Sequence, residues 1–171
     1  TPETIIWDLE TEFNTTSEEE KSYKPHNFDD QFRGPVTFRQ GLAQSINVPS
    51  VKVLYLAGID NTLKTARDFG INTLTERSRY GLSLALGGGE VKLVDLVNAY
   101  SVFSQEGIKH NQNLILKITD ANNKVLEEYN DKYTRIIEAQ YPRLINDILS
   151  DIEARRPLFQ NSLGLTTYPG Y

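Results

Sequence analysis

The stretch Ser45-Ile46-Asn47 holds the two side chains whose types and spacing suggest chemistry most directly. A serine hydroxyl is a poor nucleophile at its own pKa and needs a positioned base, whereas an asparagine amide carries both donors and an acceptor. The same residue types also suit the end of a helix, because both bond local backbone groups and asparagine tolerates the left-handed conformation. Local spacing alone therefore leaves two interpretations, a catalytic pair and a polar joint between two helices.

The other candidates for chemistry have weaker patterns. His26 and His110 lie in polar, loop-like stretches and form no His-x-x-x-His or His-Glu-x-x-His pair, so we expect no metal site and no cofactor. The run Gly87-Gly88-Gly89-Glu90 matches neither nucleotide-binding glycine motif. We expect these glycines to allow a tight turn or a close approach of the backbone to a neighbour, and to act only as scaffold.

Composition narrows the classes of protein. The 171 residues carry 18 basic and 23 acidic side chains, a formal net charge of −5, which argues against nucleic acid as a partner. No apolar run approaches the roughly 20 residues of a membrane span. Cysteine is absent, which excludes disulfides and a thiol nucleophile. Methionine is also absent, even from position 1, so we expect the chain to be a piece of a longer protein.

Two short helices are predicted on either side of the serine–asparagine stretch. Thr37 and Gln40 have the spacing of a capping box, which predicts a helix over residues 38–45. Pro49 suits the first turn of a second helix, which Gly58 should end. Short helices joined by a tight turn should hold that joint firmly.

Apolar periodicity predicts the remaining elements. They are an extended segment over residues 4–13, a helix over 61–70 capped by Asp60, and a hairpin over 113–129. A further helix, ended by Gly107, has one apolar face made of Leu93, Leu96, Val97, Tyr100 and Phe103. The last helix, over 139–154, has a buried stripe of Leu144, Ile145, Ile148, Leu149 and Ile152. Residues 14–34 and 155–171 are predicted as loops. The expected class is α+β, mostly helical with a small β-hairpin.

Four pieces of the sequence, in a fixed order, carry a resemblance that no single motif provides. They are TPETIIWD (1–8), YKPHNFDDQFRGPVTFRQGLAQSINVPSVKV (23–53), YGLSLALGGGEVKLVDLVNAYSVFSQEG (80–107) and LINDILSDIEARRPLF (144–159). Over essentially its full length, the chain resembles the transpeptidase domain of the class A penicillin-binding proteins, the bifunctional peptidoglycan synthases. Ser45 and Asn47 take the two fixed positions of the Ser-x-Asn motif of that family. The resemblance implies part of a penicillin-binding-protein/β-lactamase-like fold, with a helical subdomain.

The resemblance also implies a chemistry that runs on three motifs, of which this chain holds one. Ser-x-x-Lys supplies the nucleophile and its activating lysine, Ser-x-Asn supplies a second serine and an amide, and Lys-Thr/Ser-Gly helps to bind the substrate. No serine here has a lysine three residues later, and neither Lys21-Ser22 nor Lys64-Thr65 is followed by glycine. In the order of the family these two motifs would lie before and after residues 1–171. We therefore expect a partial transpeptidase domain that contains no nucleophile.

The resemblance gives Ser45 and Asn47 expected catalytic roles. Ser45 would bond the active-site lysine and relay a proton to the leaving amine, and Asn47 would hold that lysine and the substrate backbone. The parent protein would be a serine-type D,D-transpeptidase that cross-links peptidoglycan stem peptides and is acylated by β-lactams. It would also carry a glycosyltransferase domain and act outside the cytoplasm, anchored to the membrane through a segment not in this chain. The isolated chain is expected to be inactive, with the rest of the parent polypeptide as its partner.

Two alternatives from other classes stay open. The parent could be another acyl-serine enzyme, such as a D,D-carboxypeptidase or a β-lactamase-like protein, and the context of its Ser-x-x-Lys would discriminate. The chain could instead be a non-catalytic helical module that binds a partner or a cell-wall polymer. The occurrence of Ser45-Ile46-Asn47 at its expected place argues against this second alternative.

Overall fold

The computed structural model describes residues 1–14 and 22–160 of the chain. Within these residues, six α-helices and two short 3-10 helices carry most of the structure. The α-helices are α1 (Phe38–Ala43), α2 (Asn47–Ala57), α3 (Ile59–Asp68), α4 (Leu93–Ser104), α5 (Gln140–Ser150) and α6 (Ile152–Phe159). The 3-10 helices are η1 (Arg77–Arg79) and η2 (Leu82–Leu86). Over the described ranges, no helix has the length and apolar character needed to cross a bilayer.

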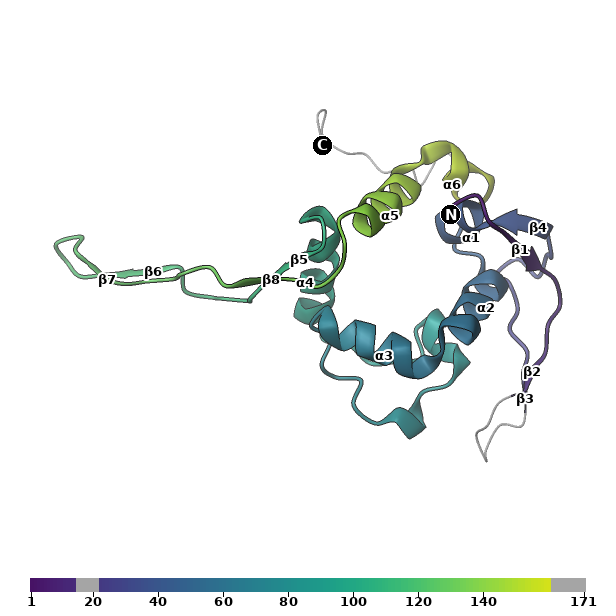
Figure 1. Cartoon of the computed structure of the whole chain (residues 1–171), viewed down its shortest axis with the longest axis horizontal. Coiled ribbons are helices and arrows are strands. Elements are labelled where there is room, and N and C mark those ends of the chain that lie inside the picture. Colours follow the sequence, from purple (N-terminus) through teal and green to yellow (C-terminus); the bar gives the residue numbers. More distant parts are fainter. Residues whose placement is uncertain (15–21, 161–171) are drawn as a thin grey trace.

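The helices are arranged in a ring, which Figure 1 shows in face view. Neighbours in the ring contact one another: α1 with α2, α2 with α3, α4 with α5, and α5 with α1. Between α3 and α4, the aromatic rings of Phe69 and Phe103 pack with their centroids 5.5 Å apart. The joint between α1 and α2 therefore lies between two helices that are each held by a further neighbour.

Arg39 ties α1 to its ring neighbours α5 and α6. Its guanidinium donates to Asp147 on α5 at 2.6 Å, to Asp151 between α5 and α6 at 3.1 Å, and to Glu3 at 3.1 Å. The hydrogen bonds that Arg39 donates to Asp147 and Glu3 raise the pKa of Arg39 above its ordinary value. Because one cation meets three carboxylates, these contacts form a network rather than an isolated surface pair.

The described strands pair antiparallel in twos rather than in one continuous sheet. The pairs are β1 (Ile5–Asp8) with β4 (Gly34–Thr37), β2 (Phe13–Asn14) with β3 (Ser22–Tyr23), β5 (Ile108–His110) with β8 (Tyr133–Arg135), and β6 (Lys117–Thr119) with β7 (Val125–Glu128). The ribbon of β6 and β7 projects from the ring in Figure 1 and confirms the hairpin predicted over residues 113–129. The α+β class, mostly helical, is confirmed as well.

The predicted start of α1 is confirmed at atomic detail. The Gln40 N–H donates to Thr37 Oγ1 at 3.1 Å, and the Thr37 N–H donates to Gln40 Oε1 at 2.9 Å, which completes the capping box. Helix α1 ends two residues earlier than predicted. Helix α2 begins at Asn47, so Pro49 lies in its first turn and Gly58 ends it, both as predicted.

Asp60 does not cap α3, which corrects one prediction. Gly58 is the N-cap, and Asp60 lies in the first turn, where its carboxylate accepts from Arg77 Nε at 2.5 Å. The chain passes from α2 to α3 through a single residue, so no extended residue is left over for an aspartate cap.

The helix predicted over residues 139–154 is in fact two helices. Asp151 has an extended backbone and accepts the Ala154 N–H at 2.9 Å, so it ends α5 and caps α6. Helix α6 then continues to Phe159, into a stretch predicted as a loop, and residues 161–171 lie outside the described part. The predicted loop over 14–34 likewise contains strand β3, which pairs with β2, and strand β4 begins at its last residue.

Gly88 and Gly89 confirm the close backbone approach expected of the glycine run. A Cβ on Gly88 would lie 2.9 Å from the Ser83 carbonyl oxygen, and a Cβ on Gly89 would lie 2.8 Å from Leu84 Cδ1. Both distances are shorter than van der Waals contact, so the segment after η2 packs onto η2 only because side chains are absent there.

The apolar core is divided into small clusters, and several apolar helix faces remain uncovered. In the stripe predicted for the last helix, Ile148 is buried, but Leu144 and Ile152 are 41% and 54% exposed. On α4, exposed side chains recur at helical spacing at Leu93, Val97 and Tyr100. The prediction that the stripe is buried is therefore wrong at Leu144 and Ile152, because periodicity identifies an apolar face but cannot tell what covers it.

Candidate functional site

Ser45 lies at the end of α1 in a left-handed conformation, with φ of 54°. Its N–H donates to the Leu42 carbonyl at 3.1 Å, and the Ile46 N–H donates to the Gly41 carbonyl at 2.9 Å. These two bonds form a Schellman motif, in which the left-handed position is usually occupied by glycine. The predicted polar joint between two helices is therefore confirmed.

A serine at this position costs free energy that a glycine would not. The left-handed conformation is unfavourable by roughly 1–2 kcal/mol for a residue that carries a Cβ. Four other described non-glycine residues also have positive φ, namely Asp30, Glu106, Asn123 and Gln160, so the conformation points to function at Ser45 only together with the state of its side chain. The Ser45 side chain is exposed, and its Oγ has no hydrogen bond to any residue of the described ranges.

Ile46 and Asn47 carry the chain from α1 into α2. Ile46 is buried and packs against Ile6 and Val36, so the middle residue of the motif anchors it in the core. The half-buried Asn47 donates from Nδ2 to the His26 carbonyl at 2.8 Å, while its Oδ1 accepts from no described residue. The joint therefore presents an unbonded hydroxyl and an unbonded amide oxygen two residues apart.

Asp8 and Asn27, which no sequence pattern pointed to, are both buried next to this joint. Asn27 Nδ2 donates to the two carboxylate oxygens of Asp8 at 2.8 and 3.0 Å, and Asn27 Oδ1 accepts the Val48 N–H of α2 at 3.1 Å. The two residues are 19 positions apart, beyond the reach of any local motif. The one signal in the sequence is that Asp8 occupies the same face of the extended segment as the apolar Ile6.

Lys52 is the basic residue of α2, and its ammonium interacts electrostatically with the buried Asp8 carboxylate. Its Nζ donates to the Trp7 carbonyl at 2.6 Å. Burial lowers the pKa of the Lys52 ammonium, and the charge of Asp8 opposes that shift. The Lys52 ammonium is thus held against strand β1, where its charge interacts with that of Asp8.

The two histidines take no part in a metal site within the described residues, where no group of three His, Asp or Glu donors occurs. His26 contributes its carbonyl to Asn47, and its ring lies 3.6 Å from an Asp30 oxygen. His110 lies on β5, where its Nδ1 contacts Asp131 at 2.8 Å and lowers the pKa of that carboxyl group. Each histidine is accounted for by a local contact.

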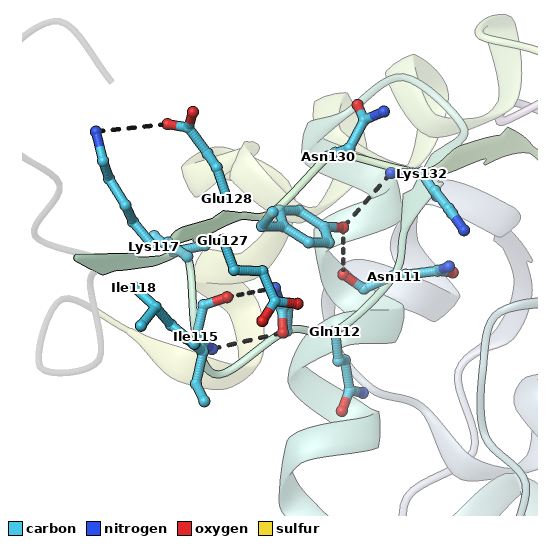
Figure 2. Close-up of a pocket in the computed structure, with 12 residues that line it drawn as sticks. Asn111, Gln112, Ile115, Lys117, Ile118, Glu127, Glu128, Asn130 and Lys132 are labelled. Atoms are coloured by element: carbon cyan, nitrogen blue, oxygen red, sulfur yellow. Dashed lines mark hydrogen bonds and ion pairs between the residues drawn. The ribbon is translucent and has the colours of Figure 1, made fainter. Parts of the chain in front are cut away.

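A pocket of about 570 Å³ lies elsewhere, at the base of the β6–β7 hairpin. Figure 2 shows Lys117 and Glu128 toward one end of it, where their charged groups are 3.8 Å apart, and Asn111 and Lys132 toward the other. The lining mixes amides, both signs of charge and aliphatic side chains, and it includes no serine or histidine. It therefore offers no serine nucleophile and no imidazole base, and the candidate site remains at the joint.

Comparisons with known proteins identify the class. No protein-family model matches the chain. Penicillin-binding protein 2D of Bacillus subtilis is 34% identical over 139 residues, which is 81% of this chain and 20% of that protein. The crystal structure of penicillin-binding protein 1A from Haemophilus influenzae matches with a TM-score of 0.76 and 25% identity, over 88% of this chain and 26% of that one.

A further structure, the D,D-transpeptidase domain of a peptidoglycan glycosyltransferase from Eggerthella lenta, matches in fold with a TM-score of 0.67 at 12% identity, over 94% of this chain and 44% of that one. The fold is thus that of part of a penicillin-binding transpeptidase domain. The chain is homologous to a segment of the penicillin-binding proteins, the class A proteins named 1A among them. It spans only 20% of the length of the Bacillus subtilis relative.

The strained joint makes a prediction about stability that does not depend on function. Replacing Ser45 by glycine should raise the free energy of unfolding of this chain by about 1 kcal/mol, because glycine adopts the left-handed conformation without strain. Urea denaturation followed by circular dichroism measures this change.

The same substitution at Ser50 is the matched control. Ser50 lies inside α2, where its Oγ donates to the Ile46 carbonyl at 2.8 Å. Glycine there should lower the free energy of unfolding by about 1 kcal/mol, since a helix interior disfavours it. A destabilising Ser45→Gly would contradict the account of the joint.

Proposed function

We propose that this chain is part of a peptidoglycan D,D-transpeptidase, in which Ser45 and Asn47 form one wall of the active site. The parent would join stem peptides through an acyl-enzyme on a serine that is not in this chain, and β-lactams would acylate that same serine. The observation that carries the proposal is the strained, exposed Ser45 at a helix joint, in a chain homologous to penicillin-binding proteins. A structural role alone would favour glycine at that position.

The contacts of the joint support distinct roles for its two polar residues. Ser45 Oγ is free among the described residues, so it can accept a hydrogen bond from a lysine ammonium and donate one to a leaving amine. Relay of a proton by a positioned hydroxyl is the general acid–base role that an acyl-transfer reaction needs.

Asn47 can bind without moving. One hydrogen of its amide nitrogen is used on the His26 carbonyl, which fixes the plane of the amide. The other hydrogen and Oδ1 remain for a substrate carbonyl and for the lysine, in keeping with the donor and acceptor capacity of an amide. A group held by a second hydrogen bond in this way is oriented before the substrate arrives.

The rest of the parent polypeptide is the proposed partner of the uncovered helix faces. On α4, Leu93, Val97 and Tyr100 are 76%, 61% and 58% exposed and share one face of the helix. Exposed apolar surface of this extent normally marks a contact with another part of a protein. We place the parent outside the cytoplasm, where peptidoglycan is assembled, with an anchor and a glycosyltransferase domain beyond this segment.

Substitution of Ser45 tests the proposed site. In a parent that contains the nucleophile, Ser45→Ala should slow acylation by a fluorescent penicillin about 10²- to 10⁴-fold, the range for loss of a general acid–base group. Ser104→Ala is the matched control and should leave the rate near wild type, because the exposed Ser104 hydroxyl donates only to the Ser101 carbonyl of its own helix, α4. Wild-type acylation in Ser45→Ala would refute the proposal. The 171-residue chain alone should take no label.

Self-association tests the proposed covering of α4. The isolated chain should form oligomers at micromolar concentration by sedimentation velocity, because its apolar faces would pack against one another. Val97→Lys should shift the chain toward monomer. Leu114→Lys, which removes an apolar side chain that is 98% exposed in the segment leading to the hairpin, should have no such effect. A monomeric unsubstituted chain would argue against an unsatisfied surface on α4.

A further inference from the structure

Asn27 connects three parts of the chain through one buried amide, with 4% of the residue exposed. Its Nδ2 donates to both oxygens of Asp8 on β1 and, at 2.7 Å, to the Gln31 carbonyl. Its Oδ1 accepts the Val48 N–H at the start of α2. The amide thus uses its nitrogen as a donor and its oxygen as an acceptor at the same time, so a substitution that removes either function breaks at least one buried hydrogen bond.

The contact with Val48 supplies a hydrogen-bond acceptor that α2 and its N-cap residue do not provide. The first N–H groups of any helix have no partner within the helix and are usually satisfied by a side chain just before it. The N-cap of α2 is Ile46, which has no side-chain acceptor. The acceptor is supplied instead by Asn27, from a loop 21 residues earlier in the chain.

The same loop also holds Asn47, which precedes Val48 and belongs to the Ser45-Ile46-Asn47 motif. The His26 carbonyl accepts from Asn47 Nδ2 at 2.8 Å, while Asn27 accepts from the backbone of Val48. Two consecutive loop residues therefore hold two consecutive residues at the first turn of α2. Any displacement of this loop would shift the Asn47 amide and, through the core-anchored Ile46, the Ser45 joint.

Asp8 sets the orientation of the Asn27 amide. The Asp8 carboxylate is fully buried and also accepts the Arg33 N–H at 3.0 Å. Rotating the amide by half a turn would direct its oxygen at this carboxylate and its NH₂ group at the Val48 N–H, which are two repulsive contacts. The acceptor must therefore face α2. At position 27, an aspartate would have no donor for the Asp8 carboxylate, and a glutamine would place its amide one methylene further from the backbone.

We infer that Asn27, oriented by the buried Asp8, is a positioning residue for the Ser45/Asn47 site. It acts through the Val48 N–H and touches no substrate. This inference rests on the proposed function, because positioning matters to the reaction only if Ser45 and Asn47 serve it.

The test exchanges the two buried side chains in a parent that contains the nucleophile. Asn27→Asp keeps an acceptor for the Val48 N–H but sets a second carboxylate against that of Asp8, which should displace the loop. The substitution should slow the acylation step with a penicillin about 10- to 100-fold, the scale of a misplacement of about 1 Å, with a smaller change in the preceding binding constant. The double variant Asp8→Asn/Asn27→Asp restores one donor and one carboxylate to the pair but leaves the Gln31 carbonyl without its donor, so its acylation rate should recover to well above that of Asn27→Asp without reaching wild type. Asn146→Asp, which alters an amide bonded only to the Phe103 carbonyl, is the control and should leave the rate unchanged.

A second variant covers the case in which Asn27→Asp does not fold. Asp8→Ala/Asn27→Ala removes the buried charge together with its partner, so the folded state should survive, yet the Val48 N–H still loses its acceptor. Acylation should therefore fall further than in Asp8→Ala alone, at a temperature where circular dichroism shows both variants to be folded. Wild-type acylation in this variant, or no recovery in the exchanged pair despite a restored melting temperature, would overturn the positioning role.

Ser45→Ala measured in parallel separates the two ideas. Slow acylation in Ser45→Ala with wild-type acylation in Asn27→Asp would remove only the role of Asn27. Wild-type acylation in both would remove the proposed function and the positioning role together. Slow acylation in both, with recovery in the exchanged pair, is the result expected.

Discussion

The carboxylate of Asp8 is fully buried, and a buried charge is tolerated only when it is paired and hydrogen-bonded. Its partners come from Asn27 and from the backbone and guanidinium of Arg33, so the loop between these residues must lie against β1. With the loop held there, its residues reach the first turn of α2, whose second N–H would otherwise lack an acceptor. Strand pairing, the path of the loop and the start of α2 thus depend on one carboxylate.

Around that constraint the chain has a rigid joint with a strained residue at its apex. The capping box at Thr37 fixes the start of α1, the Schellman bonds fix its end, and Ile46 is buried between Ile6 and Val36. Ser45 can keep an unfavourable φ because its neighbours on both sides are held. A fold selected for stability alone would relieve this strain with glycine. Under the proposed role, the Ser45 hydroxyl is kept at a cost in stability, which is common where side chains perform chemistry.

Features set by neighbouring residues could be predicted from the sequence, and features set by distant ones could not. The capping box, Pro49 in a first turn, and the β6–β7 hairpin follow from local chemistry and are confirmed. The break at Asp151 was missed because Ile152 continues the apolar spacing beyond it, and an aspartate can lie on the polar face of a helix as well as cap a new one. The Asp8–Asn27 pair was missed because only the fold brings it together. Likewise, spacing predicted the joint at Ser45, but its link to penicillin-binding proteins came from the whole chain.

The central claim is that the joint at Ser45 and Asn47 borders the acyl-enzyme of a transpeptidase. The most direct test is a crystal structure of a parent protein, with its own nucleophile acylated by a penicillin. The account predicts that Ser45 Oγ lies within about 3.2 Å of the lysine that activates the nucleophile, and that the Asn47 amide lies within about 3.2 Å of a polar atom of the bound antibiotic, both hydrogen-bond distances. An adduct with both residues far from it, and with Ser45 and Asn47 facing solvent, would contradict the claim.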